Sequence, residues 1–464
     1  MTEGIMIHDN VWTTYGKEDI EKLEKLSAGY MEFLDRGKTE RECTEIIVET
    51  AKKHGYRDLA EVTAKGEKLG RGDKVYAVNM GKAVMLFNIG EDIVNDGMNI
   101  VGAHLDSPRL DIKQNPLYES DELAYLDTHY YGGIKKYHYV VMPLALHGVV
   151  VRPDGTKITI SIGEKDGDPV FFVSDLLIHI AKEQLEKPGS TVVEGENLDI
   201  LVGSRPLEGE EKDAVKAAVL KLLKDEYGIE EDDFISAELE AVPAGKAREA
   251  GFDRSMILGY GHDDRCCAFP ELTAMMEVDK PKTTSCALFV DKEETGSRGA
   301  TGMESYFFEY MVREILVSMG ISSEAELGRC MRNSRMLSAD VTAAFDPLYA
   351  SKFEKKNSAM FGHGLTFCKY TGARGKSGSN DANAEYIARL RQIMDKHGVA
   401  YQTAEMGKVD EGGGGTIAYI LALYGMQVID CGIAVLSMHA PWEAISKSDL
   451  YESYKGYKAF LTEG

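Results

Sequence analysis

Asp291-Lys-Glu293-Glu294-Thr-Gly-Ser297 directly follows the apolar run Cys286–Val290. Five apolar residues bounded by polar ones predict a short buried strand. Carboxylates at the end of such a strand lie where α/β folds place their active sites. Neighbouring side chains on extended backbone point to opposite sides, so Glu293 and Glu294 are not expected to hold one ion together. One can then bind a metal while the other transfers protons, although a bare Glu-Glu pair is more often a solvated acidic turn.

The size and charge of the chain limit what kind of protein it can be. It has 464 residues, of which 44% are hydrophobic and 28% charged, so a sizeable core and two domains are expected. The formal net charge of −23 would repel a polyanion, which disfavours nucleic acids and anionic membrane surfaces as partners. Bound divalent cations would offset part of this charge locally.

The amino terminus and the cysteines predict a cytoplasmic location. Residues 1–20 contain no basic stretch followed by an apolar run, so no signal peptide is expected. No apolar stretch approaches the ~20 residues of a membrane span. The seven cysteines include no Cys-x-x-Cys, and the adjacent Cys266 and Cys267 have poor geometry for a disulfide. They are interpreted as small buried side chains in a reducing compartment.

The pattern of predicted strands and helices changes between Arg109 and Gly251. β-like runs such as Tyr139–Val151 stand beside charged helices predicted near Phe171–Leu185 and Asp213–Tyr227. Strands separated by long helices precede and follow this part, which is typical of a mainly parallel sheet. We therefore predict an α/β domain, residues 1–108 and 252–464, with a β-rich α+β domain, residues 109–251, inserted in it. The latter is called the insert below.

Polar side chains follow several of the predicted strands. The predicted strand Asn99–His104 ends in His104, and Asp106 follows it; at i and i+2 the two residues share one face. Asp106 can then accept a hydrogen bond from the imidazole while the other ring nitrogen binds a metal. The remaining candidates are Asp263 and Asp264 in Gly259-Tyr-Gly-His262-Asp263-Asp264-Arg265, Glu293 and Glu294, Asp340 after Ser338, and His439 after Ser437.

Each of these residues alone would be expected to have a structural role. Together they place two histidines and several carboxylates near the strand ends of one sheet. A mixed set of nitrogen and oxygen ligands suits Zn²⁺ or Mn²⁺, whereas a Ca²⁺ site would use oxygen alone. The set is large enough for two ions sharing a carboxylate, and two ions ~3.5–4 Å apart can hold a bridging hydroxide.

This ordered set resembles the aspartyl aminopeptidase family of dinuclear metallopeptidases, and the resemblance spans nearly the whole chain. It implies that Asp263 bridges two divalent ions, most naturally Zn²⁺ with Mn²⁺ or Co²⁺ as alternatives. Glu293 would be the general base, and Asp106 would orient the first histidine. The implied metal ligands are His104, Asp263, Glu294, Asp340 and His439.

The resemblance also implies a fold, an assembly and a substrate class. Its members have a catalytic α/β domain interrupted by a dimerisation domain, form homo-oligomers that are usually dodecamers, and remove N-terminal residues, often acidic ones, from peptides. In the expected mechanism Glu293 takes a proton from the bridging water and passes it to the leaving amine.

Two stretches depart from the family pattern. A family histidine that reaches a neighbouring subunit's site has Lys136 nearest to its position here, after Gly132-Gly133. The segment Lys369–Asn380 carries extra residues, and Lys369, Arg374 and Lys376 could receive an acidic side chain. His262 stands beside the bridging carboxylate and could line the site, but a packing role is the stronger expectation.

Two other functions compete with hydrolysis. Gly372-Ala-Arg-Gly375-Lys376-Ser377 is similar to a phosphate-binding loop, but Tyr370 stands where that motif needs glycine. Gly412–Gly415 precedes a predicted helix without the lysine of such a loop. A non-catalytic scaffold with one structural metal is the remaining alternative, and the presence of both Glu293 and Glu294 argues against it. Serine catalysis lacks a Gly-x-Ser-x-Gly motif.

Overall fold

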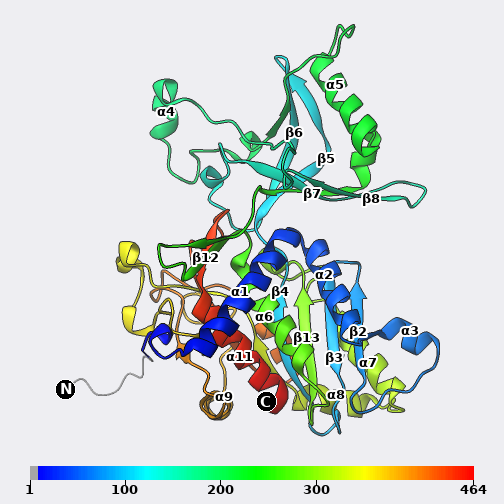
Figure 1. The fold of residues 1–464 in the computed structure, drawn as a ribbon, viewed down its shortest axis with the longest axis vertical. Coiled ribbons are helices and arrows are strands. Elements are labelled where there is room, and N and C mark those ends of the chain that lie inside the picture. Colours follow the sequence, from blue (N-terminus) through cyan, green and yellow to red (C-terminus); the bar gives the residue numbers. More distant parts are fainter. Residues whose placement is uncertain (1–8) are drawn as a thin grey trace. The chain divides into compact units, whose positions relative to one another are not determined.

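The computed structural model describes residues 9–464, and the chain forms two compact units (Figure 1). The first contains the described residues up to Asp106 together with 247–438 and 443–464; the second contains 107–246 and 439–442. The second unit overlaps most of the insert. Residues 248–250, however, form β11 (Arg248–Ala250), which pairs with β12 (Met256–Gly259) of the first unit. A dimerisation role for the insert stays a prediction.

The larger sheet of the first unit is mainly parallel, as predicted. The central strands β13, β4, β14 and β18 run parallel to one another, and the flanking β3 and β16 run antiparallel to their inner neighbours. In order across the sheet its strands are β1 (Arg57–Asp58), β2 (Lys74–Asn79), β3 (Ala83–Asn88), β13 (Thr284–Val290), β4 (Met98–His104), β14 (Arg335–Ser338), β18 (Gln427–Gly432), β16 (Leu365–Cys368) and β17 (Tyr401–Thr403).

Helices cover both faces of this sheet, so its central strands are apolar on both sides. On β13, Ala287 and Phe289 face one core, whereas Cys286, Leu288 and Val290 face the other. This double burial explains the continuous apolar run in the sequence. The first face is covered by α1 (Lys17–Arg36), α2 (Glu40–Lys53), α6 (His262–Glu277), α9 (Ala384–Lys396) and α11 (Lys447–Glu463) (Figure 1). The second is covered by α3 (Leu59–Ala64), α7 (Phe307–Ser318), α8 (Glu324–Asn333) and α10 (Ala418–Ala422).

A smaller sheet in the first unit joins segments that are far apart in the chain. Its order is β11, β12, β20 (Glu443–Ser446), β19 (Ala434–Leu436) and β15 (Thr342–Ala343). β20 runs antiparallel to β12, with Glu443 opposite Gly259 and Ser446 opposite Met256. These pairs bring polar side chains of the carboxyl-terminal region next to the start of α6.

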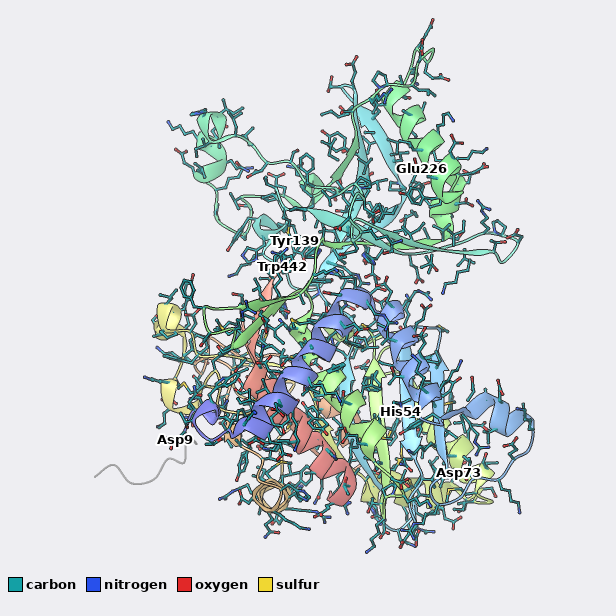
Figure 2. All side chains as sticks on the ribbon, viewed as in Figure 1. Asp9, His54, Asp73, Tyr139, Glu226 and Trp442 are labelled. Atoms are coloured by element: carbon teal, nitrogen blue, oxygen red, sulfur yellow. The ribbon has the colours of Figure 1, made fainter. Side chains whose placement is uncertain are left out.

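The second unit is β-rich, as predicted for the insert. Its antiparallel sheet has the order β8 (Lys157–Ile162), β7 (Leu144–Val151), β10 (Ala237–Pro243), β5 (Arg109–Ser120), β6 (Leu123–Tyr131) and β9 (Ile200–Gly203). α5 (Ala214–Leu222) contributes apolar side chains to the same core. Tyr139 is buried in this unit, and its hydroxyl donates a hydrogen bond to the carbonyl oxygen of Pro108 at 3.0 Å (Figure 2).

The helix predicted near Phe171–Leu185 is wrong. This stretch holds only a 3-10 turn, Ile178–Ile180, and a single helical turn, α4 (Lys182–Leu185). Several of its apolar side chains are exposed; Ile178 is 67% and Ile180 is 64% accessible. A short helix needs an apolar face packed against a partner. Here Phe171 and Val173 pack into the core of the second unit as extended chain that forms β-bridges, whereas the apolar side chains from Leu176 to Ile180 are exposed. This stretch is called the 170–185 segment below.

Within residues 9–464, the structure contains no helix that combines the length and the apolar character needed to cross a membrane.

Candidate metal centre and active site

His104, the last residue of β4, is buried and its ring is held in one orientation. Its Nδ1 lies 2.9 Å from the backbone carbonyl oxygen of Asp106 and 3.4 Å from the carboxylate Oδ1 of the same residue. The nearer partner is therefore the carbonyl rather than the predicted carboxylate. Nε2 makes no hydrogen bond to any described residue and lies 3.2 Å from Oδ1 of Asp263. A buried ring nitrogen oriented in this way is a suitable metal ligand.

The first turn of α6 supplies Asp263 and Asp264, which have different partners. The peptide bond between them is cis. The Asp263 backbone N–H donates to Oε2 of the buried Glu443 at 3.0 Å, and Oδ2 of Asp264 accepts from the His104 backbone N–H at 3.2 Å. Asp264 thus supports the end of β4 while Asp263 is left facing the imidazole. The sequence did not point to Glu443, because only the pairing of β20 with β12 brings it here.

His104, Asp263 and Asp340 form a group that fits a metal ion. One ligand atom from each lies within 4.8 Å of the others. Burial raises the pKa of Asp340 well above its usual range, and the negative charges of Glu293 and Asp263 add to the shift. A cation bound among these carboxylates would relieve this repulsion, and one nitrogen with two oxygens is a donor set that zinc accepts.

A second carboxylate approaches Asp263 from the Glu293-Glu294 stretch. One oxygen of Glu294 lies within 4.8 Å of one oxygen of Asp263. Oε2 of Glu293 lies 3.9 Å from Nε2 of His104. Asp263 therefore has His104 and Asp340 near one of its oxygens and Glu294 within reach of an oxygen as well, which is the arrangement required of a bridging ligand.

The expectation of extended backbone at Glu293 and Glu294 is wrong. The residues Glu293–Thr295 form a 3-10 turn between Lys292 at φ 68° and Gly296 at φ 94°. The Asp106 carboxylate binds this turn, because Oδ1 accepts the Glu293 N–H at 3.1 Å and Oδ2 accepts the Glu294 N–H at 3.2 Å. Asp106 thus positions both glutamates in addition to the imidazole.

Two predicted residues, His439 and Lys136, lie in the second unit. His439 has its Nδ1 2.8 Å from the carbonyl oxygen of Gly133. Lys136 places its ammonium 6.0 Å from the ring centre of Tyr130. The role of His439 as a metal ligand and the role of Lys136 in substrate contacts stay predictions.

The remaining residues predicted to contact the substrate differ in whether their side chains are accessible to it. His262 is buried, with Nδ1 2.6 Å from the Tyr30 hydroxyl and Nε2 3.1 Å from the Ile257 carbonyl oxygen. Burial lowers its pKa to about 3, so the ring is neutral, and its geometry favours packing over substrate contact. Lys369 is exposed. Lys376 is engaged, since its ammonium lies 3.0 Å from Asp381.

Another cluster of potential ligands, Asp264 with Cys266 and Cys267, is better explained by packing. Their ligand atoms lie within 4.8 Å of one another, and all three residues are buried. Burial raises the pKa of the Cys266 thiol to about 12 and that of Cys267 well above its usual range. A metal would need a thiolate, which this environment disfavours.

The nucleotide-binding interpretation is wrong. A phosphate-binding loop leads directly into a helix whose first amides face the ligand. Here Ala373 and Ser377 pair across a tight turn, and the next helix, α9, begins only at Ala384. The Gly372 N–H donates to the carbonyl oxygen of Gly414 at 2.8 Å, so the two glycine-rich loops bind each other.

Comparison with known proteins identifies the family of this chain. Residues 33–461 match the family described as Aminopeptidase I zinc metalloprotease (M18). The chain belongs to the M18 family of aminopeptidases. A probable M18 family aminopeptidase 1 from Clostridium acetobutylicum is 57% identical over 98% of each chain. Membership makes this protein a metal-dependent aminopeptidase, and zinc is the metal that the family description names.

Solved M18 structures have the same fold. The crystal structure of the M18 aminopeptidase from Thermotoga maritima superposes with a TM-score of 0.94 at 44% identity, covering 99% of this chain and 100% of that one. Aminopeptidase I from C. acetobutylicum gives a TM-score of 0.91 at 55% identity over 98% of each chain. The S. cerevisiae mApe1 dodecamer, at 19% identity and a TM-score of 0.76 over 95% and 97% of the two chains, shares the fold alone.

Proposed function

We propose that this M18 aminopeptidase works with two zinc ions per chain, held by the ligands predicted from the sequence. The observation that carries the proposal is the position of Asp263, with His104 and Asp340 on one side and Glu294 also within reach. His104 and Asp340 would complete one ion, and Glu294 with His439 the other. Metal analysis of the purified protein, combined with a screen of aminoacyl anilides, tests this.

Zinc bound by these residues would polarise the scissile carbonyl and activate the attacking water. Glu293 is not a member of the His104 group, and its carboxylate is only partly buried, so a bound substrate can come within reach of it. It takes the proton of the attacking water and delivers it to the leaving amine. Asp106 keeps Glu293 in place through the amide hydrogen bond, and it holds His104 through its carbonyl.

For substrate choice, we propose that Lys369 receives an acidic side chain at the amino-terminal residue of the peptide. Among residues 9–464, its ammonium makes no ion pair, whereas Lys376 is already paired with Asp381. The net charge of −23 repels acidic peptides at long range, so any acidic preference has to arise locally.

Lys369→Met should lower kcat/KM for Asp- and Glu-peptides about 10-fold and spare Leu-peptides, because a shielded charged hydrogen bond contributes ~1.5–3 kcal/mol. Parallel kinetics on Asp-, Glu- and Leu-anilides provide the measurement. Lys376→Met, in the same segment, should leave the ratio of the substrates unchanged. Equal losses on all three substrates would assign Lys369 a structural role.

We also propose that the protein is a homo-oligomer assembled through the insert, as the related S. cerevisiae enzyme is a dodecamer. The 170–185 segment supports this, because it exposes large apolar side chains on a soluble unit. They are Val170, Phe172, Leu176, Leu177, Ile178, Ile180 and Leu185. Between 170 and 181 the only formally charged residue is Asp175, so two copies of this anionic chain could meet here with little repulsion.

Light scattering on the intact protein should show a large homo-oligomer, and Ile178→Glu combined with Ile180→Glu should dissociate it. The added charges would have to be desolvated in an apolar contact. Leu348→Glu, at another exposed leucine in the first unit, is the matched control and should leave the mass unchanged. A fully active wild-type monomer, or a double variant of unchanged mass, would contradict the proposal.

A cytoplasmic location is proposed from the cysteines. All seven lie in the described part of the chain, where each is a buried free thiol. Free thiols are typical of a reducing compartment.

A further inference from the structure

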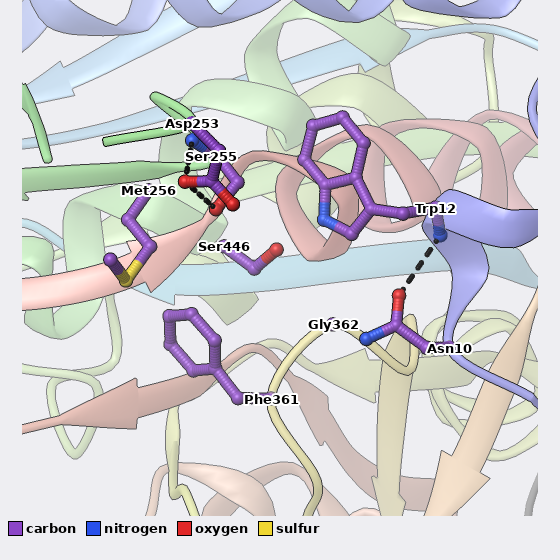
Figure 3. A pocket seen from close by; sticks show the side chains of 8 residues that line it. All are labelled: Asn10, Trp12, Asp253, Ser255, Met256, Phe361, Gly362 and Ser446. Carbon is purple, nitrogen blue, oxygen red and sulfur yellow. Dashed lines mark hydrogen bonds between the residues drawn. The ribbon is translucent and has the colours of Figure 1, made fainter. Parts of the chain in front are cut away.

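A pocket lies in the first unit, and the described residues that line it include none of the predicted metal ligands. Its volume is about 450 Å³, within the range of small-molecule sites. It is built where the amino-terminal part of the described chain meets the β11–β12 hairpin, a turn near residue 361 and the end of β20. The residues around it are Asn10, Trp12, Asp253, Ser255, Met256, Phe361, Gly362 and Ser446 (Figure 3).

Three of the residues around this pocket, Trp12, Met256 and Phe361, have aromatic or apolar side chains. Figure 3 shows the Trp12 indole across the pocket from the Phe361 ring, with the Met256 thioether near the latter. All three side chains are partly exposed, so their surfaces are accessible to a ligand. Aromatic faces attract cations, and tryptophan does so most strongly. A thioether provides a polarisable apolar contact.

One carboxylate gives the pocket a negative charge that the protein does not neutralise. Both hydrogen bonds from Ser255, from its backbone N–H at 3.2 Å and its hydroxyl at 3.0 Å, go to Oδ1 of Asp253. Oδ2 has no hydrogen bond or ion pair within residues 9–464. The adjacent Arg254 is paired with Glu249 at 3.3 Å instead.

Asp253 is ionised at neutral pH. The hydrogen bond from the Ser255 backbone, with that from its hydroxyl, lowers the pKa of this carboxyl below its usual range. Asp253 is exposed, so a neutral ligand would gain no attraction from its hydrated charge, and an anion would be repelled both by Asp253 and by the net charge of −23.

We propose that this pocket binds a small organic ammonium ion with an apolar body. The ammonium group would lie against Oδ2 of Asp253, and the apolar body would lie between Trp12 and Phe361. The site is independent of the aminopeptidase centre, because its lining shares no residue with the His104, Asp263 and Asp340 group.

The chain provides its own reporter for a binding test. It contains two tryptophans, Trp12 in the pocket and Trp442, so Trp442→Phe leaves Trp12 as the only indole emitter. This variant is titrated with choline and with 3,3-dimethyl-1-butanol, the uncharged carbon isostere, at constant ionic strength. Choline should produce a saturable change in Trp12 emission and bind about 10-fold more tightly than the alcohol.

Asp253→Asn, in the same background, keeps an acceptor for Ser255 and removes only the charge. It should weaken choline binding about 10-fold and leave binding of the alcohol unchanged. Asp279→Asn, at an exposed carboxylate outside the pocket, should change neither affinity.

Three results would overturn the proposal: no saturable response to choline, equal affinities for choline and the alcohol, or equal effects of Asp253→Asn and Asp279→Asn. If Asp253→Asn fails to fold, the affinities of the Trp442→Phe variant for choline and for the alcohol are sufficient to test the proposal. Because emission of Trp12 is measured rather than hydrolysis, loss of the proposed peptidase activity would not affect the result.

Discussion

Glu293→Gln is expected to lower kcat by about 10²–10⁴-fold while the metal content stays unchanged, as is typical for loss of a general base. The glutamine keeps its backbone N–H, which still donates to Oδ1 of Asp106, so the 3-10 turn is retained. KM should change little, because the amide can still hydrogen-bond a water molecule but cannot take its proton. The measurement is steady-state kinetics on aminoacyl anilides, with metal analysis of the same samples.

Adding excess Zn²⁺, Mn²⁺ or Co²⁺ should not restore the Glu293→Gln variant, because no ligand has been removed. Asp279→Asn, a surface carboxylate change, serves as the control for general electrostatic effects. If Glu293→Gln loses metal and Glu294→Gln does not, the roles of the two residues are reversed. If neither change affects activity, the dinuclear mechanism is wrong.

Asp263→Asn is expected to reduce activity by at least ~10²-fold through loss of both metal ions. One oxygen of its carboxylate lies within 4.8 Å of ligand atoms of His104 and Asp340, and one oxygen lies within 4.8 Å of an oxygen of Glu294. An amide has one oxygen and no charge, so it cannot serve two cations as a bridging carboxylate can. Elemental analysis should show a fall from about two ions per chain toward none.

Glu294→Gln is the matched comparison, since it removes the same charge from a residue predicted to hold only one ion. It should retain about one ion per chain, and its activity should return in part with excess metal. A wild-type content of one ion, or equal retention of metal in both variants, would contradict the assignment of Asp263 as the bridge.

Much of the fold could be predicted from local sequence patterns. The apolar run of β13 predicted a buried strand because both faces of the sheet are covered by helices, which leaves no polar side in the alternation. The ends of β4 and β14 placed His104 and Asp340 at the same edge, since parallel strands end together. In contrast, the predicted helix at 171–185 failed, because apolar residues in a row form a stable helix only where a partner surface buries them.

Only the tertiary structure decided how the predicted residues are held. The bonds from Asp106 to the amides of Glu293 and Glu294 join positions 187 and 188 residues apart, and Glu443 reaches the Asp263 amide across 180 residues. No local periodicity reports such pairings, because they depend on which strands and loops become neighbours after folding. The residue types by themselves determined that a metal could be bound. The 3-10 turn and its hydrogen bonds to Asp106 place Glu294 near Asp263 and Glu293 beside His104. Because two glutamates are chemically identical, only their positions in the folded protein can give them different roles.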